Sequence, residues 1–178
     1  MLLLTGDAEA TAVAGIALAS AAVAGGRRTV LVECDLTHPR LAAQLGLSAA
    51  PGVHEYLRWE AEPGEILQPL VLGGPAASGA AEPLVCICGG RPASKTATLL
   101  GLQSFAHMIE KLRGAYELVV VTGPSIEDEP EACGAVARRA EAVIAAQAPD
   151  GRATRSLRAA IKRLPAPAVG AISIAQRS

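Results

Sequence analysis

Residues 30–41, with the sequence VLVECDLTHPRL, decide the fold of this chain. The stretch opens with a run of apolar residues that predicts a short strand at 29–33, buried on both faces. Two carboxylates, Glu33 and Asp35, stand where this strand ends, and Pro39 precedes a predicted helix. Ligands of parallel sheets bind at the carboxyl ends of the strands, so this stretch also marks the edge where a site is expected.

The same pattern of a short apolar run followed by a helical segment repeats along the chain. Further strands are predicted at 1–5, 83–88, 117–121, 142–146 and 169–174. Helices are predicted at 8–24, 40–45, 53–58, 97–113, 130–139 and 154–164. Residues 63–83, rich in Gly and Pro, are predicted to be mostly loop, with a helical turn at 65–67. The alternation predicts an α/β fold of three layers, in which helices cover both faces of a doubly wound, mostly parallel sheet.

Length and composition are those expected of one globular domain spanning residues 1–178. The hydrophobic fraction of 51% and the charged fraction of 19% favour a packed core over disorder. The longest uncharged stretch, 10–26, is rich in Ala and Gly and too short and weakly apolar to predict a membrane span. No secretory signal is recognised, so the four cysteines are expected to be reduced core thiols of a cytoplasmic protein.

The net charge of −1 gives no overall basic field that would attract nucleic acid or anionic lipid. Basic residues do gather near the end of the chain, at Arg152, Arg155, Arg158, Lys162 and Arg163. This group is interpreted as the solvated face of a helix rather than as a binding patch. Trp59 follows a short predicted helix and is expected to pack against the protein; a contact with a partner is the alternative.

Residues 30–41 closely resemble the second Walker motif of the bacterial tyrosine kinases, the regulators of capsule and exopolysaccharide assembly within the ParA/MinD-type P-loop NTPases. In that family an apolar strand leads into Asp-x-Asp, a basic pair and Pro-Arg-Leu. Segments 45–47 and 52–57 look like the family's continuation. Later segments that look like the family, in the same order, are 84–90, 96–100, 116–124, 140–146 and 169–172. The resemblance covers nearly the whole chain and implies a P-loop NTPase-like fold.

The phosphate loop that the resemblance leads one to expect is degenerate. In the family, Gly-Lys-Ser/Thr follows the first strand, and the backbone N–H groups and the Lys hold the phosphates. The matching residues here are Gly6, Asp7, Ala8, Glu9, Ala10 and Thr11. Glu9 stands in place of the lysine and Ala8 in place of the preceding glycine, so Asp7 and Glu9 would face a triphosphate with like charge, at a cost of several kcal/mol. Only Thr11 is retained as a vestigial magnesium ligand.

The other acidic positions of the family motifs are also altered. Asp35 matches the second acidic residue of Asp-x-Asp and Glu33 replaces the first; both are interpreted as vestigial, solvated residues at a strand end. Thr122 ends the strand at which the family's Walker B motif has Asp, and Ile174 stands near its Asn. Four acids follow, at Glu127, Asp128, Glu129 and Glu131. One interpretation is a displaced metal site. The favoured interpretation is that these acids suit the positive end of the next helix at its start.

Loss at both Walker motifs favours a catalytically inactive pseudokinase that acts as a protein-interaction or regulatory module. This hypothesis predicts no cofactor, neither ATP nor a metal ion, and no catalytic residue. The resemblance implies a partner in exopolysaccharide or capsule biosynthesis, such as a polysaccharide-assembly protein or a membrane co-polymerase; a second copy of the chain is the alternative partner. The protein would then be cytoplasmic, associated with the membrane only through that partner.

Two other functions stay open. In the first, the chain is a tyrosine kinase or ATPase with an altered site that binds ATP and magnesium. Asp35 would be its base, Glu33 its metal ligand and Arg40 its phosphate contact. In the second, it is a positioning protein of the ParA/MinD type that binds DNA or membrane through the basic helix at 154–164, a hypothesis that rests on fold-level analogy.

Overall fold

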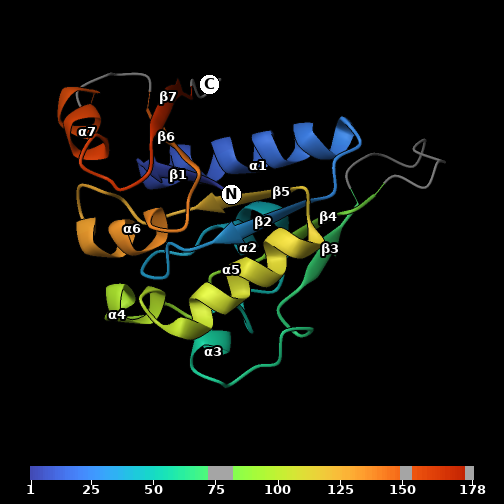
Figure 1. The fold of residues 1–178 in the computed structure, drawn as a ribbon. Coiled ribbons are helices and arrows are strands. Elements are labelled where there is room, and N and C mark those ends of the chain that lie inside the picture. Colours follow the sequence, from blue (N-terminus) through green and yellow to red (C-terminus); the bar gives the residue numbers. More distant parts are fainter. Residues whose placement is uncertain (72–81, 149–153, 175–178) are drawn as a thin grey trace.

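The computed structural model describes residues 1–71, 82–148 and 154–174, and these contain a central seven-stranded sheet (Figure 1). The strand order is β3-β4-β2-β5-β1-β6-β7. The strands are β1 Leu2–Gly6, β2 Thr29–Glu33, β3 Gln68–Leu70, β4 Leu84–Ile87, β5 Leu118–Thr122, β6 Ala142–Gln147 and β7 Ala168–Ser173. Neighbouring strands pair in parallel except for β3, which runs antiparallel to β4 at one edge.

Helices cover both faces of this sheet and make the three layers that the sequence predicts. The helices are α1 Ala8–Ala24, α2 Leu41–Leu45, α3 Val53–Leu57, α4 Thr96–Leu100, α5 Gln103–Ala115, α6 Pro130–Ala137 and α7 Thr154–Ile161. Successive strand residues alternate between two cores: Leu3 packs in the core under α5 and α6, whereas Leu4 packs in the core under α1. Figure 1 shows α1 and α5 on opposite sides of the sheet. The predicted doubly wound α/β fold is therefore confirmed.

Small residues on the buried face of α1 let this helix approach the sheet closely. A Cβ atom at Gly15 would lie 2.4 Å from Cγ2 of Thr122 in β5, so only glycine fits at that contact. Ala12, Ala14 and Ala19 are buried on the same helix. The close approach holds the middle of α1 against the carboxyl end of β5.

The four cysteines lie in the core, as expected. Cys34, Cys86, Cys88 and Cys133 are buried and free. Burial raises the pKa of Cys86 to about 11 and that of Cys88 to about 12, so both stay protonated near neutral pH. Protonated, inaccessible thiols are poor nucleophiles and poor metal ligands.

Two predicted elements differ from the structure. The helix predicted at 97–113 is broken in two: Gly101 ends α4, and Leu102 adopts an extended conformation before α5 begins. The segment predicted as loop at 63–83 contains the short strand β3, and its residues 72–81 lie outside the described part of the chain. The side chain of Gln68 holds β3 in place by bonding both the N–H and the carbonyl of Ser48.

Candidate site at the carboxyl ends of the central strands

The segments that resemble the three Walker motifs come together at one edge of the sheet. β5 lies between β1 and β2 and pairs with both. Thr122 in β5 stands level with Leu4 of β1 on one side and with Glu33 of β2 on the other. The connections that follow these three strands therefore lie side by side, which is where a P-loop fold places its nucleotide.

The connection between β1 and α1 is too short to be a phosphate loop. β1 ends at Gly6 and α1 begins at Ala8, so Asp7 alone joins them. Gly6 has φ +136°, and a Cβ atom there would lie 2.1 Å from the carbonyl oxygen of Ala146, so the turn requires glycine. A Walker A loop instead places several residues between strand and helix to wrap the phosphates. The predicted strand and helix already left only two residues between them, which was the sequence signal for this shortening.

Asp7 fills the helix N-terminus that would receive a phosphate. Its carboxylate accepts a hydrogen bond of 2.8 Å from the N–H of Ala10, and its own N–H donates to the carbonyl of Ala146 at 3.0 Å. The carboxylate is thus an N-cap, rather than a charge facing an empty phosphate site. Glu9 is exposed in the first turn, where an acidic side chain suits the positive end of the helix dipole.

Thr11, the retained hydroxyl of the motif, is 2% exposed and its Oγ1 atom has no hydrogen-bond partner among the described residues. It lines a cavity of about 10 Å³. The lining residues are Ala8, Thr11, Ala12, Glu33, Asp35, His38, Arg40, Thr122 and Gly123. This volume, at the centre of the Walker-like segments, matches about one water molecule.

Glu33 is a buried structural carboxylate, so the interpretation of it as a solvated strand-end residue is wrong. It is 2% exposed, and its Oε1 atom accepts from the N–H groups of Arg40 at 2.5 Å and Leu41 at 2.9 Å. Its Oε2 atom accepts from the N–H of Gly89 at 2.9 Å. Burial raises the pKa of Glu33, although these three backbone hydrogen bonds act in the opposite direction. The side chain ties the start of α2 to the end of β4.

Asp35 is 8% exposed, so it too is not the solvated residue that the sequence suggested. Its Oδ1 atom accepts from the N–H of His38 at 2.9 Å, which closes a turn directly after β2. Burial raises the pKa of Asp35; the His38 hydrogen bond opposes this rise and the nearby Glu129 carboxylate adds to it. Two carboxylates that follow different strands therefore face each other at this site.

The acidic run after β5 takes part in specific contacts. Glu129 is the N-cap residue of α6, but its side chain does not cap the helix and accepts instead from Oγ1 of Thr96. Glu127 accepts from Oγ of Ser156, and Glu131 lies in the first turn of α6. Only Glu131 fits the predicted role of an acid at a helix start.

One ligand atom each of Asp35, His38 and Glu129 lies within 4.8 Å of the other two. Asp35 and Glu129 are candidate residues from the sequence, but nothing in the sequence brings them together, since Glu129 is remote from Asp35 and sits in a run of acids that fitted a helix start. The pairing of β2 with β5 is what places them side by side.

Thr122 ends β5 with a hydroxyl side chain. Its side chain is buried, and its hydroxyl lies 3.5 Å from the carbonyl oxygen of Val32 in the neighbouring strand. The residue therefore packs within the sheet and against Gly15, where the family has a magnesium-ordering acid.

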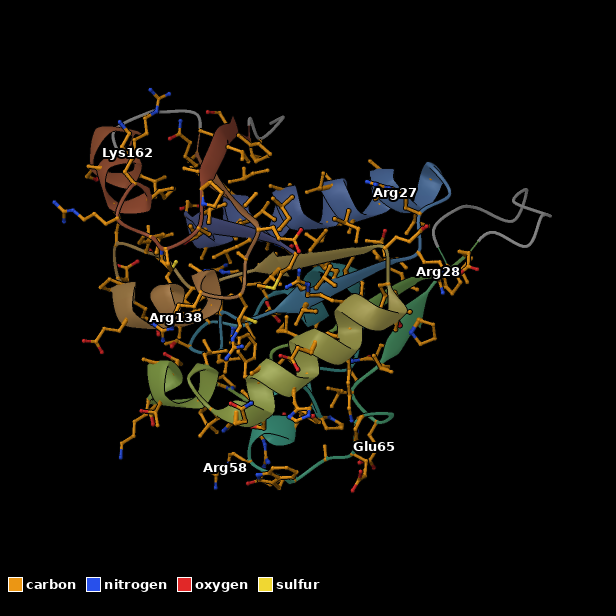
Figure 2. All side chains as sticks on the ribbon, viewed as in Figure 1. Arg27, Arg28, Arg58, Glu65, Arg138 and Lys162 are labelled. Atoms are coloured by element: carbon orange, nitrogen blue, oxygen red, sulfur yellow. The ribbon has the colours of Figure 1, made fainter. Side chains whose placement is uncertain are left out.

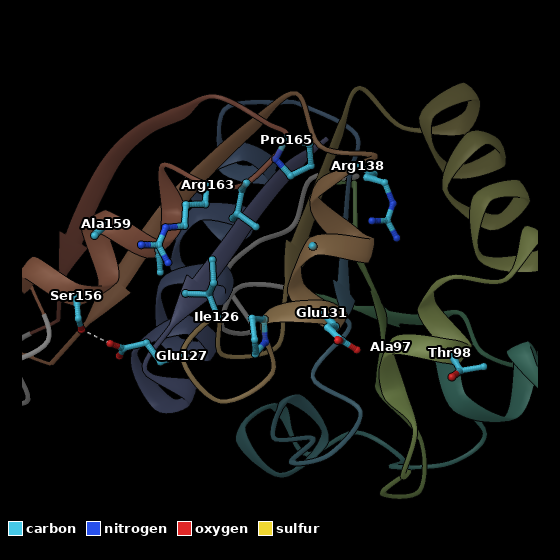
Figure 3. A pocket seen from close by; sticks show the side chains of 14 residues that line it. Ala97, Thr98, Ile126, Glu127, Glu131, Arg138, Ser156, Ala159, Arg163 and Pro165 are labelled. Carbon is cyan, nitrogen blue, oxygen red and sulfur yellow. Dashed lines mark hydrogen bonds between the residues drawn. The ribbon is translucent and has the colours of Figure 1, made fainter.

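A larger groove of about 1020 Å³ lies to one side, between α4, α6 and α7 (Figure 3). Its apolar lining includes Ile126, Leu164 and Pro165. Its charged lining residues are Glu127, Glu131, Arg138 and Arg163. Among the lining residues, Ser156 donates a hydrogen bond to Glu127.

The basic residues near the end of the chain form an exposed face, as predicted for those that are described. Arg158, Lys162 and Arg163 are exposed, and Figure 2 shows Lys162 at the outer side of α7. Arg152 and the side chain of Arg155 lie outside the described part of the chain. Among the described helices, none is both long enough and apolar enough to cross a membrane.

The fold described above is also found in known proteins. No protein-family model matches the chain, and no curated protein matches it in sequence. Solved structures do match: the VpsO kinase domain has a TM-score of 0.79 at 23% identity, over 99% of this chain and 84% of that chain.

Two further solved structures extend the comparison. The kinase domain of Escherichia coli tyrosine kinase ETK has a TM-score of 0.80 at 18% identity, over 99% of this chain and 68% of that chain. The septum site-determining protein MinD from Pyrococcus horikoshii, complexed with Mg-ADP, has a TM-score of 0.70 at 17% identity, over 97% of this chain and 68% of that chain. The chain therefore has the fold of bacterial tyrosine kinase domains and of MinD-type P-loop NTPases.

Proposed function

We propose that this chain is a catalytically inactive, bacterial tyrosine kinase-like domain that works by binding a protein partner. The observation that carries the proposal is the connection from β1 to α1, where Asp7 is the sole linking residue and its carboxylate caps the helix. A phosphate group needs the same N–H groups and the same positive helix end. The chain supplies its own anion at that position.

Two further features support the absence of nucleotide chemistry. The cavity among the Walker-like segments measures about 10 Å³, whereas ligand pockets measure roughly 300 Å³ or more. Thr122 provides no carboxylate to order a magnesium shell. The short loop, the small cavity and the missing carboxylate all support the proposal that no nucleotide is bound, although they arise from separate parts of the sequence.

Trp59 supports a role in protein contacts. It is 83% exposed, which corrects the expectation that it packs against the protein. Its φ of 63° is a left-handed conformation that is unfavourable for a residue with a Cβ atom. A large aromatic side chain that is exposed and has a strained backbone contributes little to the fold, and Trp is among the residue types enriched at interaction hot spots.

The kind of partner follows from the family resemblance in the sequence. We place the chain in exopolysaccharide or capsule biosynthesis, in the cytoplasm, bound to a polysaccharide-assembly protein or a membrane co-polymerase. The groove between α4, α6 and α7 is a second candidate contact surface, because it combines apolar walls with charges of both signs.

Titration with ATP and ADP, with and without magnesium, tests the proposal. A ligand that binds the folded state must raise the melting temperature, and a binding reaction releases or absorbs heat. No shift and no heat at millimolar nucleotide are expected. A magnesium-dependent shift would overturn the proposal and make the altered enzyme, with Asp35 as its base, the leading function.

A further inference from the structure

Asp35 and His38 line the small cavity among the Walker-like segments, and Glu129 approaches them from the next segment. Asp35 and His38 belong to the turn after β2, and Glu129 belongs to the segment between β5 and α6. A ligand atom of each lies within 4.8 Å of the other two. Ligand atoms about 2.1 Å from a tetrahedral metal ion stand about 3.4 Å apart, so small side-chain rotations would bring this trio to bonding distance.

Each of the two carboxylates is held in place by a hydrogen bond. Asp35 accepts from the N–H of His38. The same turn places a ring nitrogen of His38 close to the two carboxylates. Glu129 accepts from Oγ1 of Thr96, a buried residue at the start of α4. Outer contacts of this kind orient metal ligands and are a regular part of metal sites in proteins.

A second observation points to a missing ligand in the cavity that two of the three residues line. Thr11 lines the small cavity together with Asp35 and His38, and its buried hydroxyl has no partner among the described residues. The cavity has about the volume of one water molecule. A water bound to a metal ion would supply the hydrogen-bond partner that Thr11 lacks, since a site with three protein ligands keeps one position open.

The ligand chemistry selects the class of ion. One imidazole with two carboxylates suits zinc and similar divalent transition ions, whereas an all-oxygen set would suit magnesium or calcium. We propose that Asp35, His38 and Glu129 bind a single divalent transition-metal ion, zinc in the first instance, without any nucleotide. The ion would join the turn after β2 to the start of α6 and neutralise two facing carboxylates.

Calorimetric titration of the untagged, reduced chain with Zn²⁺, in the absence of nucleotide, tests this site. The wild-type chain should bind one ion and gain melting temperature on binding. His38→Ala and Glu129→Gln should each weaken binding by at least about 10-fold. His107→Ala, which removes an exposed histidine from α5, is the matched control and should bind as the wild type does.

The choice of variants separates loss of a metal ligand from loss of folding. His38 is exposed, so His38→Ala should keep the metal-free melting temperature of the wild type even if Asp35→Asn fails to fold. Thr96→Val, which removes the hydrogen bond to Glu129 without touching a ligand, should weaken zinc binding by roughly 10-fold. Absence of saturable zinc binding, or equal binding by wild type and His38→Ala, would overturn the proposal. Because no nucleotide is present, this outcome is independent of the test for ATP binding.

Discussion

At the scale of single residues, the carboxylate of Asp7 has two effects. It caps α1 through the N–H of Ala10, and it takes the position of a phosphate at the helix start. Asp7→Ala should lower the free energy of unfolding by about 1 kcal/mol, because the N–H loses its partner. Chemical denaturation measures this change. Asp7→Ser should retain most of the stability; equal stability of Asp7→Ala and the wild type would contradict the capping role.

Trp59 gives the opposite case, a residue that costs the fold stability. Its left-handed conformation should be relieved in Trp59→Gly, which we expect to be about 0.5–1 kcal/mol more stable than Trp59→Ala after the extra freedom of unfolded glycine is included. Thermal denaturation of the two variants, followed by circular dichroism, measures the difference. Both should bind a partner more weakly than the wild type. A glycine variant no more stable than the alanine variant would show that no strain is stored there.

At the scale of elements, Glu55 joins α3 to the turn after β4. Its Oε2 atom accepts from the N–H of Gly52, and its Oε1 atom accepts from the backbone and the guanidinium of Arg91. Gly90 passes so close that a Cβ atom there would lie 2.1 Å from Oε2 of Glu55. Burial tends to raise the pKa of Glu55, but the hydrogen bonds from Arg91 and Gly52 outweigh it and hold the pKa below its usual value.

This lowered pKa sets the sign of a pH dependence. A carboxylate whose pKa is lower in the folded state adds stability above its unfolded pKa, near 4.5, and loses it as the pH falls through the folded value. Glu55→Gln should therefore cost about 2 kcal/mol at pH 7 and progressively less below pH 4.5. Urea denaturation from pH 3 to 7 measures the difference. The exposed Glu110→Gln on α5 is the control; a deficit in Glu55→Gln that is constant with pH would contradict the charged contact.

At the scale of the whole molecule, local sequence patterns predicted most of the fold but little of the site's geometry. Apolar runs marked the buried strands, and the start and end of α1 matched the prediction. The strand β3 was missed because Pro69 and the surrounding Gly and Pro residues indicate a loop. The buried state of Glu33 was missed because its three backbone donors come from segments that only the folded chain brings together. The proximity of Asp35 and Glu129 depends in the same way on strand order.

The short connection between β1 and α1 is a greater obstacle to nucleotide binding than the loss of the Walker charges. Glu9→Lys with Thr122→Asp would restore the two missing charges of the Walker motifs, yet Asp7 would still be the sole residue joining strand and helix. The double variant should therefore bind ATP no better than the wild type, because a lysine cannot replace the backbone donors of a phosphate loop.

Isothermal titration of the wild-type chain and of this double variant with Mg-ATP tests the central claim most directly. We expect no heat of binding above dilution for either protein at millimolar nucleotide. Saturable binding by the double variant alone would contradict the argument from loop length and leave lost charges as the cause. Saturable, magnesium-dependent binding by the wild type would contradict the inactive site itself.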